Sequence, residues 1–564
     1  KTMKYASIVI VIFILLIRYG KTQKYMLDET NLEGTTEIEP RVVEGGYQNL
    51  RIRYGTEQLT LPNKDILYRA LDKAIEKVQK VLKIKERDGP LRMSKLSCRL
   101  KETCSHKDEY DNFIEYKVCR SDNNEYFSKV CQKYTQLSAY NVMIPELTLY
   151  RSDCKIGEKK YGGKGIPNTD FVLLIEQGTL CDGNMFKQQI PCAIDRVSTR
   201  PIVGNINVCI IGTNEELVYK NILRELLLVL GAGPDKYPYW TDKFSRQRLV
   251  NITRTVEQTN RDTTVTKIIT DPVKAHVKAH YACDTADGVE IDDKGLLKQR
   301  LVYNEILTSK LDVDTEYVLS ELSLSILEST GWYQPVYELA DKLIFGRKRG
   351  CNFLNNQCLK KTSNFYPEIP YEDNWCAIVA EDRCSNNRRQ KGRCGVYDYT
   401  SNLEQRYQFY SRADYGGLSY MEYCPVAEDF SSCITGSPSV SNERGEVYGN
   451  NSFCFSNSLN YDNNTAITNS TGCYEIKCIS ETTMNITLAR NITIVCHANE
   501  AGEEKKVQGY GGSIECPKIQ DVCPKASSNI NIIRCVYGTL ENNKCVCDSK
   551  HYGVSCDREK PNNV

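Results

Sequence analysis

The stretch that most constrains the fold is residues 213–233, TNEELVYKNILRELLLVLGAG. Thr213 stands three residues before Glu216, which is the spacing of a capping box at a helix N-terminus. Gly231 and Gly233 are signals that end a helix. The five successive apolar residues at 226–230 would surround this helix, so we expect it to lie in the core rather than on the surface.

The same helix contains Arg224-Glu225-Leu226-Leu227-Leu228. These residues have the frame of the H-E-x-x-H motif, in which two histidines four residues apart bind zinc and the glutamate acts as a base. Here Arg224 and Leu228 occupy the two histidine positions. Leucine has no lone pair to offer, and a guanidinium stays protonated and has no acceptor. The sequence therefore predicts a metallopeptidase scaffold that has lost its metal site.

The segments around this helix predict an α+β unit. Apolar residues alternate with polar ones at 50–54, which predicts a strand, and helical spacing runs from 66 to 82. Two apolar runs, at 170–176 and 201–211, are strand candidates. The helix at 213–230 is then the last element of this unit.

Cysteine content limits the compartment. The chain has 26 cysteines, an even number, all between Cys98 and Cys556 and without metal-type CxxC pairs. That pattern predicts disulfides formed in an oxidising compartment. With 73 basic and 72 acidic residues the charge is balanced, so nothing in the composition points to nucleic acid as a partner.

The N-terminus agrees with secretion. Residues 1–20 have a basic start and an apolar run at 6–17, which predicts a signal peptide, although an uncleaved anchor remains an alternative. The polar, acidic residues 21–48 predict a linker or pro-segment. The chain ends without an apolar tail. Glycosylation is predicted at six Asn-x-Ser/Thr sites: Asn251, Asn450, Asn463, Asn469, Asn485 and Asn491.

Beside the degenerate helix, seven short motifs follow one another along the chain. They are DFVL at 170–173 with Cys181, RPIVGNINVC at 200–209, HYAC at 280–283, NEILT at 304–308, GWY at 331–333, GRKRGC at 346–351 and GGLSYMEYCP at 416–425. In sequence and in order these motifs resemble those of leishmanolysin, the surface zinc metallopeptidase family of the metzincin group, and the resemblance covers roughly residues 50 to 510.

The resemblance implies a third zinc histidine well after the helix, shortly before a Met-turn. The register set by residues 300–305 places Leu296 at that ligand position and Leu307 at the Met-turn methionine. Three ligand positions would then carry Arg224, Leu228 and Leu296, so no cofactor is predicted. Glu225, the equivalent of the general base, is predicted to be non-functional and to serve as a counter-ion to a basic group.

Other catalytic chemistries find little support. His276 and His280 are four residues apart and would share a helix face, but no glutamate lies between them in the H-E-x-x-H manner. We expect a structural or surface role for both, with an unusual metal site as the alternative. His106, His497 and His551 lie among cysteines. No G-x-S-x-G elbow is found, and an even cysteine set leaves no obvious free thiol for catalysis.

The predicted fold class is α+β, with the resemblance implying a metzincin-like domain and a disulfide-rich C-terminal domain. Cys535, Cys545, Cys547 and Cys556 resemble an EGF-like module, with Cys516 and Cys523 as expected upstream members. The predicted domains are an N-terminal subdomain at 49–233, a central subdomain with the Met-turn equivalent at 234–350, a Cys-rich domain at 351–515 and the EGF-like module at 516–557.

Two functions follow. The first is a pseudopeptidase: a secreted or cell-surface glycoprotein that binds an extracellular protein or peptide, or contributes to adhesion. The second is an active zinc metalloendopeptidase, as the resemblance alone would imply. The missing ligands favour the first. The partner, the disulfide connectivity and any association with a membrane are left open.

Overall fold

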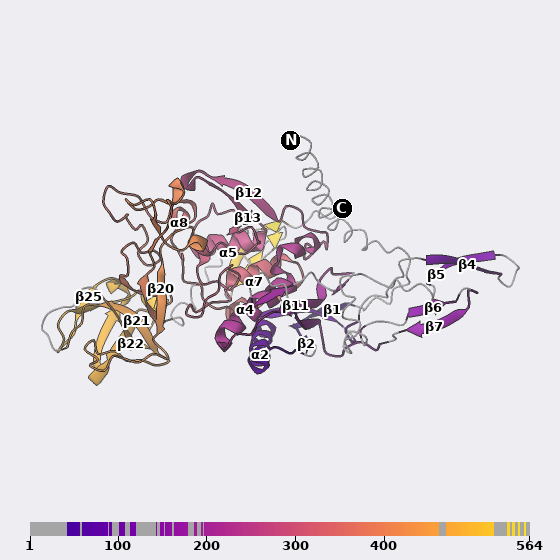
Figure 1. Cartoon of the computed structure of the whole chain (residues 1–564), viewed down its shortest axis with the longest axis horizontal. Helices are drawn as coiled ribbons and strands as arrows, with labels where there is room; N and C mark the ends of the chain where they lie inside the picture. Colours follow the sequence, from indigo (N-terminus) through magenta and orange to yellow (C-terminus); the bar gives the residue numbers. More distant parts are fainter. Residues whose placement is uncertain are drawn as a thin grey trace, which may run out of the picture. The chain divides into compact units, whose positions relative to one another are not determined.

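The computed structural model describes residues 42–523 with gaps, and four short segments beyond them at 538–541, 544–547, 551–552 and 558–559 (Figure 1). The gaps are 57–58, 88, 93–100, 108–112, 120–142, 144–146, 152, 161–162, 179–184, 189–192, 196 and 462–469. The predicted signal peptide, most of the predicted linker, Asn463 and Asn469 lie outside the described residues. None of the described helices combines the length and apolarity that a bilayer crossing requires.

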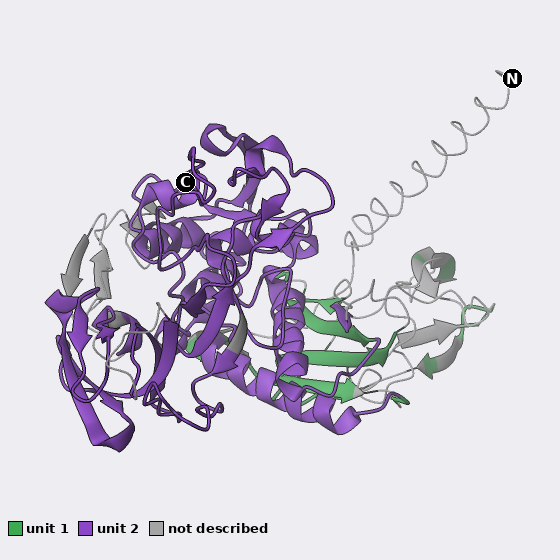
Figure 2. Cartoon of the chain, turned by 60° about the vertical axis from the view of Figure 1, so that its left-hand side comes forward, with its two compact units in different colours: residues 1–60, 84–179, 189–208 green, residues 61–83, 180–188, 209–564 purple. Residues whose placement is uncertain are grey.

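The chain forms two compact units (Figure 2). The first comprises residues 1–60, 84–179 and 189–208, and the second comprises 61–83, 180–188 and 209–564. The predicted domain boundaries are positions in the sequence that this division does not test, and they stay predictions.

The first unit is built on parallel strands whose central members are buried. β8 pairs in parallel with β2 on one side and with β11 on the other, and β10 pairs antiparallel with β11. All eight residues of β11 are buried, as expected for a strand covered on both faces. The three strands predicted from apolar patterning are therefore confirmed. The strands of this unit are β1 (Val42–Asn49), β2 (Ile52–Thr56), β4 (Lys101–Lys107), β5 (Phe113–Cys119), β6 (Leu147–Tyr150), β7 (Ile156–Lys160), β8 (Phe171–Gln177), β10 (Ala193–Ile194) and β11 (Pro201–Val208).

Two features of this unit add to the sequence-based picture. β1 begins at Val42, so the end of the segment predicted as a linker is a strand. The carboxylate of Asp170, 1 % exposed, accepts a two-pronged ion pair from Arg51 at 2.8 Å, which ties the start of β8 to the chain just before β2. A disulfide joins Cys104 of β4 to Cys154.

The helices whose bounds are described lie in the second unit. They are α2 (Lys64–Val81), α4 (Glu215–Leu227), α5 (Asp271–Tyr281), α6 (Gln299–Val302), α7 (Glu321–Ser329), α8 (Cys351–Asn355) and α9 (Ile519–Val522), with shorter turns at η2 (Leu228–Ala232), η3 (Pro234–Tyr239), η4 (Thr259–Arg261), η5 (Tyr337–Leu339), η6 (Gln405–Tyr407), η7 (Ser419–Met421), η8 (Ala489–Asn491) and η9 (Ala498–Glu500). The helix predicted at 66–82 is α2. It packs on α4, and ion pairs from Arg69 to Glu215 and from Lys73 to Glu216 flank that contact.

The strands of the second unit form several small sheets. They are β9 (Phe186–Gln188), β12 (Thr253–Gln258), β13 (Thr263–Ile268), β14 (Val289–Ile291), β15 (Tyr333–Pro335), β16 (Asp382–Cys384), β17 (Gln390–Cys394), β18 (Tyr397–Asp398), β19 (Tyr415–Gly416), β20 (Ala427–Ser432), β21 (Ser452–Asn457), β22 (Ser470–Cys478), β23 (Thr483–Leu488), β24 (Ile492–His497), β25 (Glu504–Lys506), β26 (Ser513–Glu515), β27 (Gly538–Glu541), β28 (Lys544–Cys547), β29 (His551–Tyr552) and β30 (Arg558–Glu559), while β3 (Leu82–Arg87) crosses the boundary between the units.

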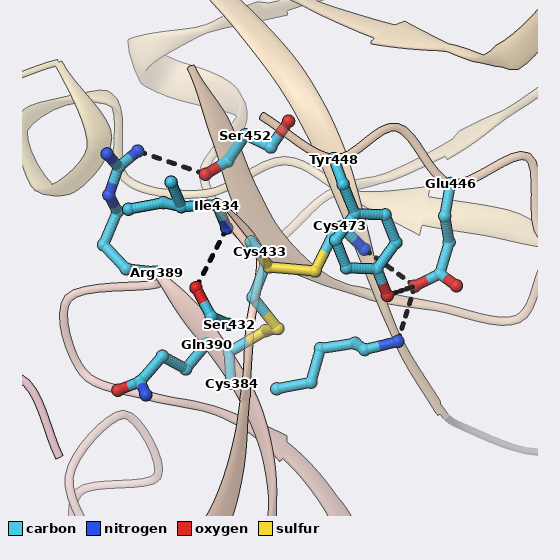
Figure 3. Close-up of a disulfide and its surroundings, with 12 residues drawn as sticks. Cys384, Arg389, Gln390, Ser432, Cys433, Ile434, Glu446, Tyr448, Ser452 and Cys473 are labelled. Atoms are coloured by element: carbon cyan, nitrogen blue, oxygen red, sulfur yellow. Dashed lines mark hydrogen bonds and ion pairs between the residues drawn. A yellow bond between two sulfur atoms is a disulfide. The ribbon is translucent and has the colours of Figure 1, made fainter. Parts of the chain in front are cut away.

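Disulfides cross-link the part of the second unit that follows α7, as predicted. A six-stranded sheet, in the order β24-β23-β22-β21-β26-β25, carries an apolar core. Figure 3 shows the disulfide that joins Cys433 to Cys473, with Cys384 beside it. Cys384 forms a second disulfide, with Cys454. Beside them Glu446, 6 % exposed, accepts from Lys391 at 2.8 Å, so the buried carboxylate has a charged partner. The other described bridges of this unit are Cys283–Cys351, Cys358–Cys424, Cys376–Cys394, Cys478–Cys523 and Cys496–Cys516.

These bridges correct one detail of the predicted EGF-like module. Cys516 pairs with Cys496 of β24, and Cys523 pairs with Cys478 of β22. Both cysteines are therefore bonded to strands of the six-stranded sheet and are not available as upstream members of the module. The expectation was wrong because spacing alone does not determine which cysteines pair. The module itself stays a prediction for the segments beyond 523.

Candidate functional site

Helix α4 carries the motif positions, and it starts one residue later than the capping box predicted. Asn214, not Thr213, is the N-cap: its side chain accepts from the Leu217 N–H at 2.9 Å. After Leu227 the helix continues as one π-helical turn, η2, which ends at Ala232. Gly231 has φ +152°, and a Cβ there would lie 3.0 Å from Thr330 and Trp332, so only glycine fits.

The guanidinium of Arg224, at the predicted first ligand position, has a hydrogen-bond network of its own. Arg224 is 5 % exposed and lies 3.2 Å from the carboxylate of Glu225. A second nitrogen of the same group donates to the carbonyls of Thr308 (3.4 Å) and Ser309 (3.2 Å). The side-chain oxygen of Asn221 accepts, at 3.2 Å, from the guanidinium nitrogen that also donates to Glu225. Glu225, also 5 % exposed, is therefore the counter-ion of Arg224.

One turn earlier on α4, Lys220 also donates to backbone carbonyls of the segment that follows Thr308. Its ammonium, on a side chain that is 4 % exposed overall, donates to the carbonyls of Val313 at 3.0 Å and Thr315 at 2.7 Å, with Asp312 at 3.4 Å. Burial lowers the pKa of Lys220, while the acidic side chains around it oppose that shift. Lys220 and Arg224 are four residues apart and so share one face of α4. Together they bind α4 to the backbone of residues 308–315.

The sequence analysis identified only one of the two cations on this face of α4. Arg224 was singled out because it stands at a motif position, but Lys220 was missed. The available signal was a second cation at i−4 on a helix predicted to be buried, since a buried lysine must find acceptors.

The other positions of the predicted site are buried leucines. Leu228 is 6 % exposed, Leu296 9 % and Leu307 2 %. A hydrogen bond of 2.9 Å from the Leu297 N–H to the Leu307 carbonyl joins the segment holding the predicted third ligand position to the Met-turn equivalent. The side chains present offer no zinc donor at these positions. That Leu296 is the third ligand position stays a prediction.

A buried carboxylate shapes the turn around Leu307. Glu305 is fully buried and accepts from the Leu307 N–H at 2.8 Å and from both the N–H and the hydroxyl of Ser320. Burial raises the pKa of Glu305, and these donors oppose the rise. The turn is therefore held by hydrogen bonds that do not depend on the side chain at 307, which fits leucine keeping the volume of methionine.

A second cation lies near Glu225. Lys236, just after η2, is fully buried and pairs with Asp235 at 2.6 Å. Burial lowers the pKa of Lys236, and the carboxylates of Asp235 and Glu225 act against that shift. Glu225, at the predicted position of the general base, thus has the positive side chains of Arg224 and Lys236 near it.

The three histidines whose side chains are described have structural partners. His276 lies 3.5 Å from the carboxylate of Glu321, and His280 contacts the Phe345 carbonyl at 2.8 Å. Both are on α5, as predicted from their spacing, but each bonds to a different element. His497 contacts the hydroxyl of Thr483 at 3.2 Å. Within the described residues, no group of three or more His, Cys, Asp or Glu side chains is placed to hold a metal ion.

His280 makes a pH prediction possible. Burial lowers its pKa from 6.5 to about 4; the Phe345 carbonyl opposes this shift, Arg347 adds to it, Glu321 weakly opposes it and His276 weakly adds to it. The unfolded chain therefore binds more protons between pH 6.5 and 4, so stability should fall with pH by about 3 kcal/mol across that window. Urea titration followed by tryptophan fluorescence at pH 7 and pH 4.5 would measure it.

The matched control is His280→Gln, whose amide keeps a donor for the Phe345 carbonyl. Its stability should lose less on acidification than that of the parent. Equal losses in the two proteins would show that His280 does not carry the effect.

Comparison with known proteins places these features in a family. The leishmanolysin family (peptidase M8) matches residues 139–532 of this chain. A leishmanolysin-like peptidase of Caenorhabditis elegans is 26 % identical over 467 residues, covering 67 % of this chain and 69 % of the relative. The corresponding protein of Caenorhabditis briggsae is 25 % identical over 455 residues, covering 66 % and 68 %. Leishmanolysin of Leishmania donovani is 24 % identical over 388 residues, covering 64 % and 62 %. Because the family match spans well over half of its length, the chain belongs to the leishmanolysin family, a family of zinc metallopeptidases.

Proposed function

We propose that this member of the family is a pseudopeptidase that acts by binding an extracellular protein or peptide, or in adhesion. The observation that carries the proposal is the buried guanidinium of Arg224, held between Glu225 and the carbonyls of residues 308 and 309. A permanent cation with no lone pair stands at a ligand position, and the base beside it is already paired.

The energetics support loss of hydrolysis. In zinc enzymes the metal lowers the pKa of its bound water from 15.7 to about 7. Without that shift, ionising the water costs roughly 12 kcal/mol more, at 1.36 kcal/mol for each pKa unit. A carboxylate base contributes only about 10²–10⁴-fold. Glu225 alone would leave most of this barrier in place.

The disulfide-rich sheets support a secreted or cell-surface location, because such bridges form and persist in oxidising compartments. Members of the family are surface or secreted proteins. The balanced charge gives no reason to add nucleic acid to the partners. Membrane association is an open part of this proposal.

The test is zinc content and proteolysis measured on the same secreted protein. After dialysis, elemental analysis is expected to find no stoichiometric zinc, and gelatin should stay uncut with or without a chelator. A family member with an intact H-E-x-x-H motif, treated in the same way, is the positive control. One zinc per chain together with chelator-sensitive cleavage would instead establish the active zinc metalloendopeptidase.

A further inference from the structure

One edge of the six-stranded sheet lacks the usual protection of exposed strands. Among the described strands β24 is terminal in this sheet, with β23 as its neighbour. Its pairing with β23 runs for six residues without a bulge. The sequence Ile-Thr-Ile-Val-Cys before His497 has high β-propensity, no charge and no proline, so it is a template for pairing with another chain.

The opposite edge of the sheet shows the contrast. β25 is only three residues long and reads Glu-Lys-Lys. Short length and charge are the standard means by which proteins keep an edge from pairing. β24 has neither. Apart from its ladder with β23, the residues 492–496 make no backbone hydrogen bond in the described part of the chain.

Two of the predicted glycosylation sites fall on this same hairpin. Asn485 of β23 is directly opposite Val495 of β24, and Val495 is 44 % exposed. The threonines of the two sites, Thr487 and Thr493, also face each other. Asn491 ends the turn immediately before β24 and is exposed.

The face that carries these residues points away from the core. Met484, Ile486 and Ile494 alternate with them and belong to the apolar core of the sheet. Asn485, Thr487, Thr493 and Val495 are therefore on the outer face. Neither Asn485 nor Asn491 donates a side-chain hydrogen bond within the described residues, so both amides are available for modification without loss of a contact.

The geometry points to N-linked glycans on Asn485 and Asn491 as the cover of edge strand β24, which they keep from pairing with a second copy of the chain. In the modification, the amide Nδ2 bonds to C1 of the first sugar. The C1–O bond to a polyprenyl diphosphate donor breaks, the diphosphate leaves with the electron pair, and the amide loses a proton. The inference rests on the proposed secretory route and is independent of the zinc site.

Glycan occupancy is tested first. The full chain, secreted from a eukaryotic cell, is treated with an amidase that releases N-glycans in ¹⁸O water, and peptides are read by mass spectrometry. Conversion of both Asn485 and Asn491 to ¹⁸O-labelled aspartate is expected. Unmodified asparagine at both positions in the secreted protein would overturn the proposal.

The protective role is tested by comparing variants. The double variant Asn485→Gln/Asn491→Gln should aggregate or dimerise, with a roughly tenfold faster rise in light scattering than the parent. Asn251→Gln removes a predicted site from another part of the chain and should behave like the parent. Adding Val495→Lys to the double variant places a charge on the edge and should restore the monomer.

Poor secretion of the double variant would not block the test. An endoglycosidase can trim the glycans of the folded parent protein to a single sugar, after which scattering should rise in the same way. If both the trimmed protein and the double variant stay monomeric, the glycans do not protect β24. If the fully glycosylated parent already pairs through β24, the edge is an interface and the proposal fails.

Discussion

Replacing Arg224 by methionine is expected to destabilise the second unit by about 3–5 kcal/mol, because removing one partner of a buried ion pair is strongly destabilising. Here the group that loses this partner is Glu225, whose side chain is 7 % exposed. The carbonyls of Thr308 and Ser309 lose their donor as well. All three tryptophans, Trp240, Trp332 and Trp375, lie in this unit, so fluorescence during urea unfolding reports on it directly.

Two further variants separate the ion pair from general damage. Arg393→Met removes an arginine whose side chain is 68 % exposed, and it should change stability by less than about 0.5 kcal/mol. The double variant Arg224→Met/Glu225→Met replaces both charges by apolar groups and should recover much of the loss. An Arg224→Met protein as stable as the Arg393→Met control would mean that Arg224 does not hold α4 in place.

The two cations of α4 give the scaffold a link that does not require a metal. A zinc ion links its helix to distant ligands, and that binding energy becomes folding energy. In this chain, Lys220 and Arg224 provide a link of another kind, through hydrogen bonds from α4 to the carbonyls of residues 308–315. Because charge-assisted hydrogen bonds are stronger than neutral ones, a few of them can hold this contact.

Several helices and strands could be predicted from the sequence, because the patterns that indicate them are local. Helical spacing and apolar runs depend on neighbouring residues, so α2, α4 and the buried strands β8 and β11 were predicted within a few positions. The chemistry of Arg224 and Leu228 as non-ligands also follows from side-chain type alone.

The contacts that give these residues their roles were not readable. The acceptors of Lys220 lie 92 to 95 residues away, and the backbone acceptors of Arg224 lie 84 and 85 away. Periodicity carries no information at that separation. The pairing of Cys516 with Cys496 was missed for the same reason, because a spacing pattern does not say which sulfurs meet.

Restoring all three ligand positions in the variant Arg224→His/Leu228→His/Leu296→His is expected to give one bound zinc per chain. Histidine nitrogen binds zinc at about 2.0–2.1 Å, and three such ligands with one open position make a catalytic-type site. The change also removes the guanidinium that forms an ion pair with Glu225. Bound metal would offset the lost ion pair, by about 2.7 kcal/mol when free zinc is 100 times its dissociation constant.

The matched control is Arg224→His/Leu228→His/Leu297→His, which moves the third histidine by one residue. Leu297 is also buried, at 1 % exposure, so the two variants should suffer comparable packing loss. Only the Leu296 variant should retain zinc through dialysis and gain thermal stability when zinc is added. Equal zinc in both would show that the register placing Leu296 at the third position is wrong. No zinc in either would mean that the backbone no longer holds these three positions around one point, and that substitution of ligands alone cannot return this scaffold to metal binding.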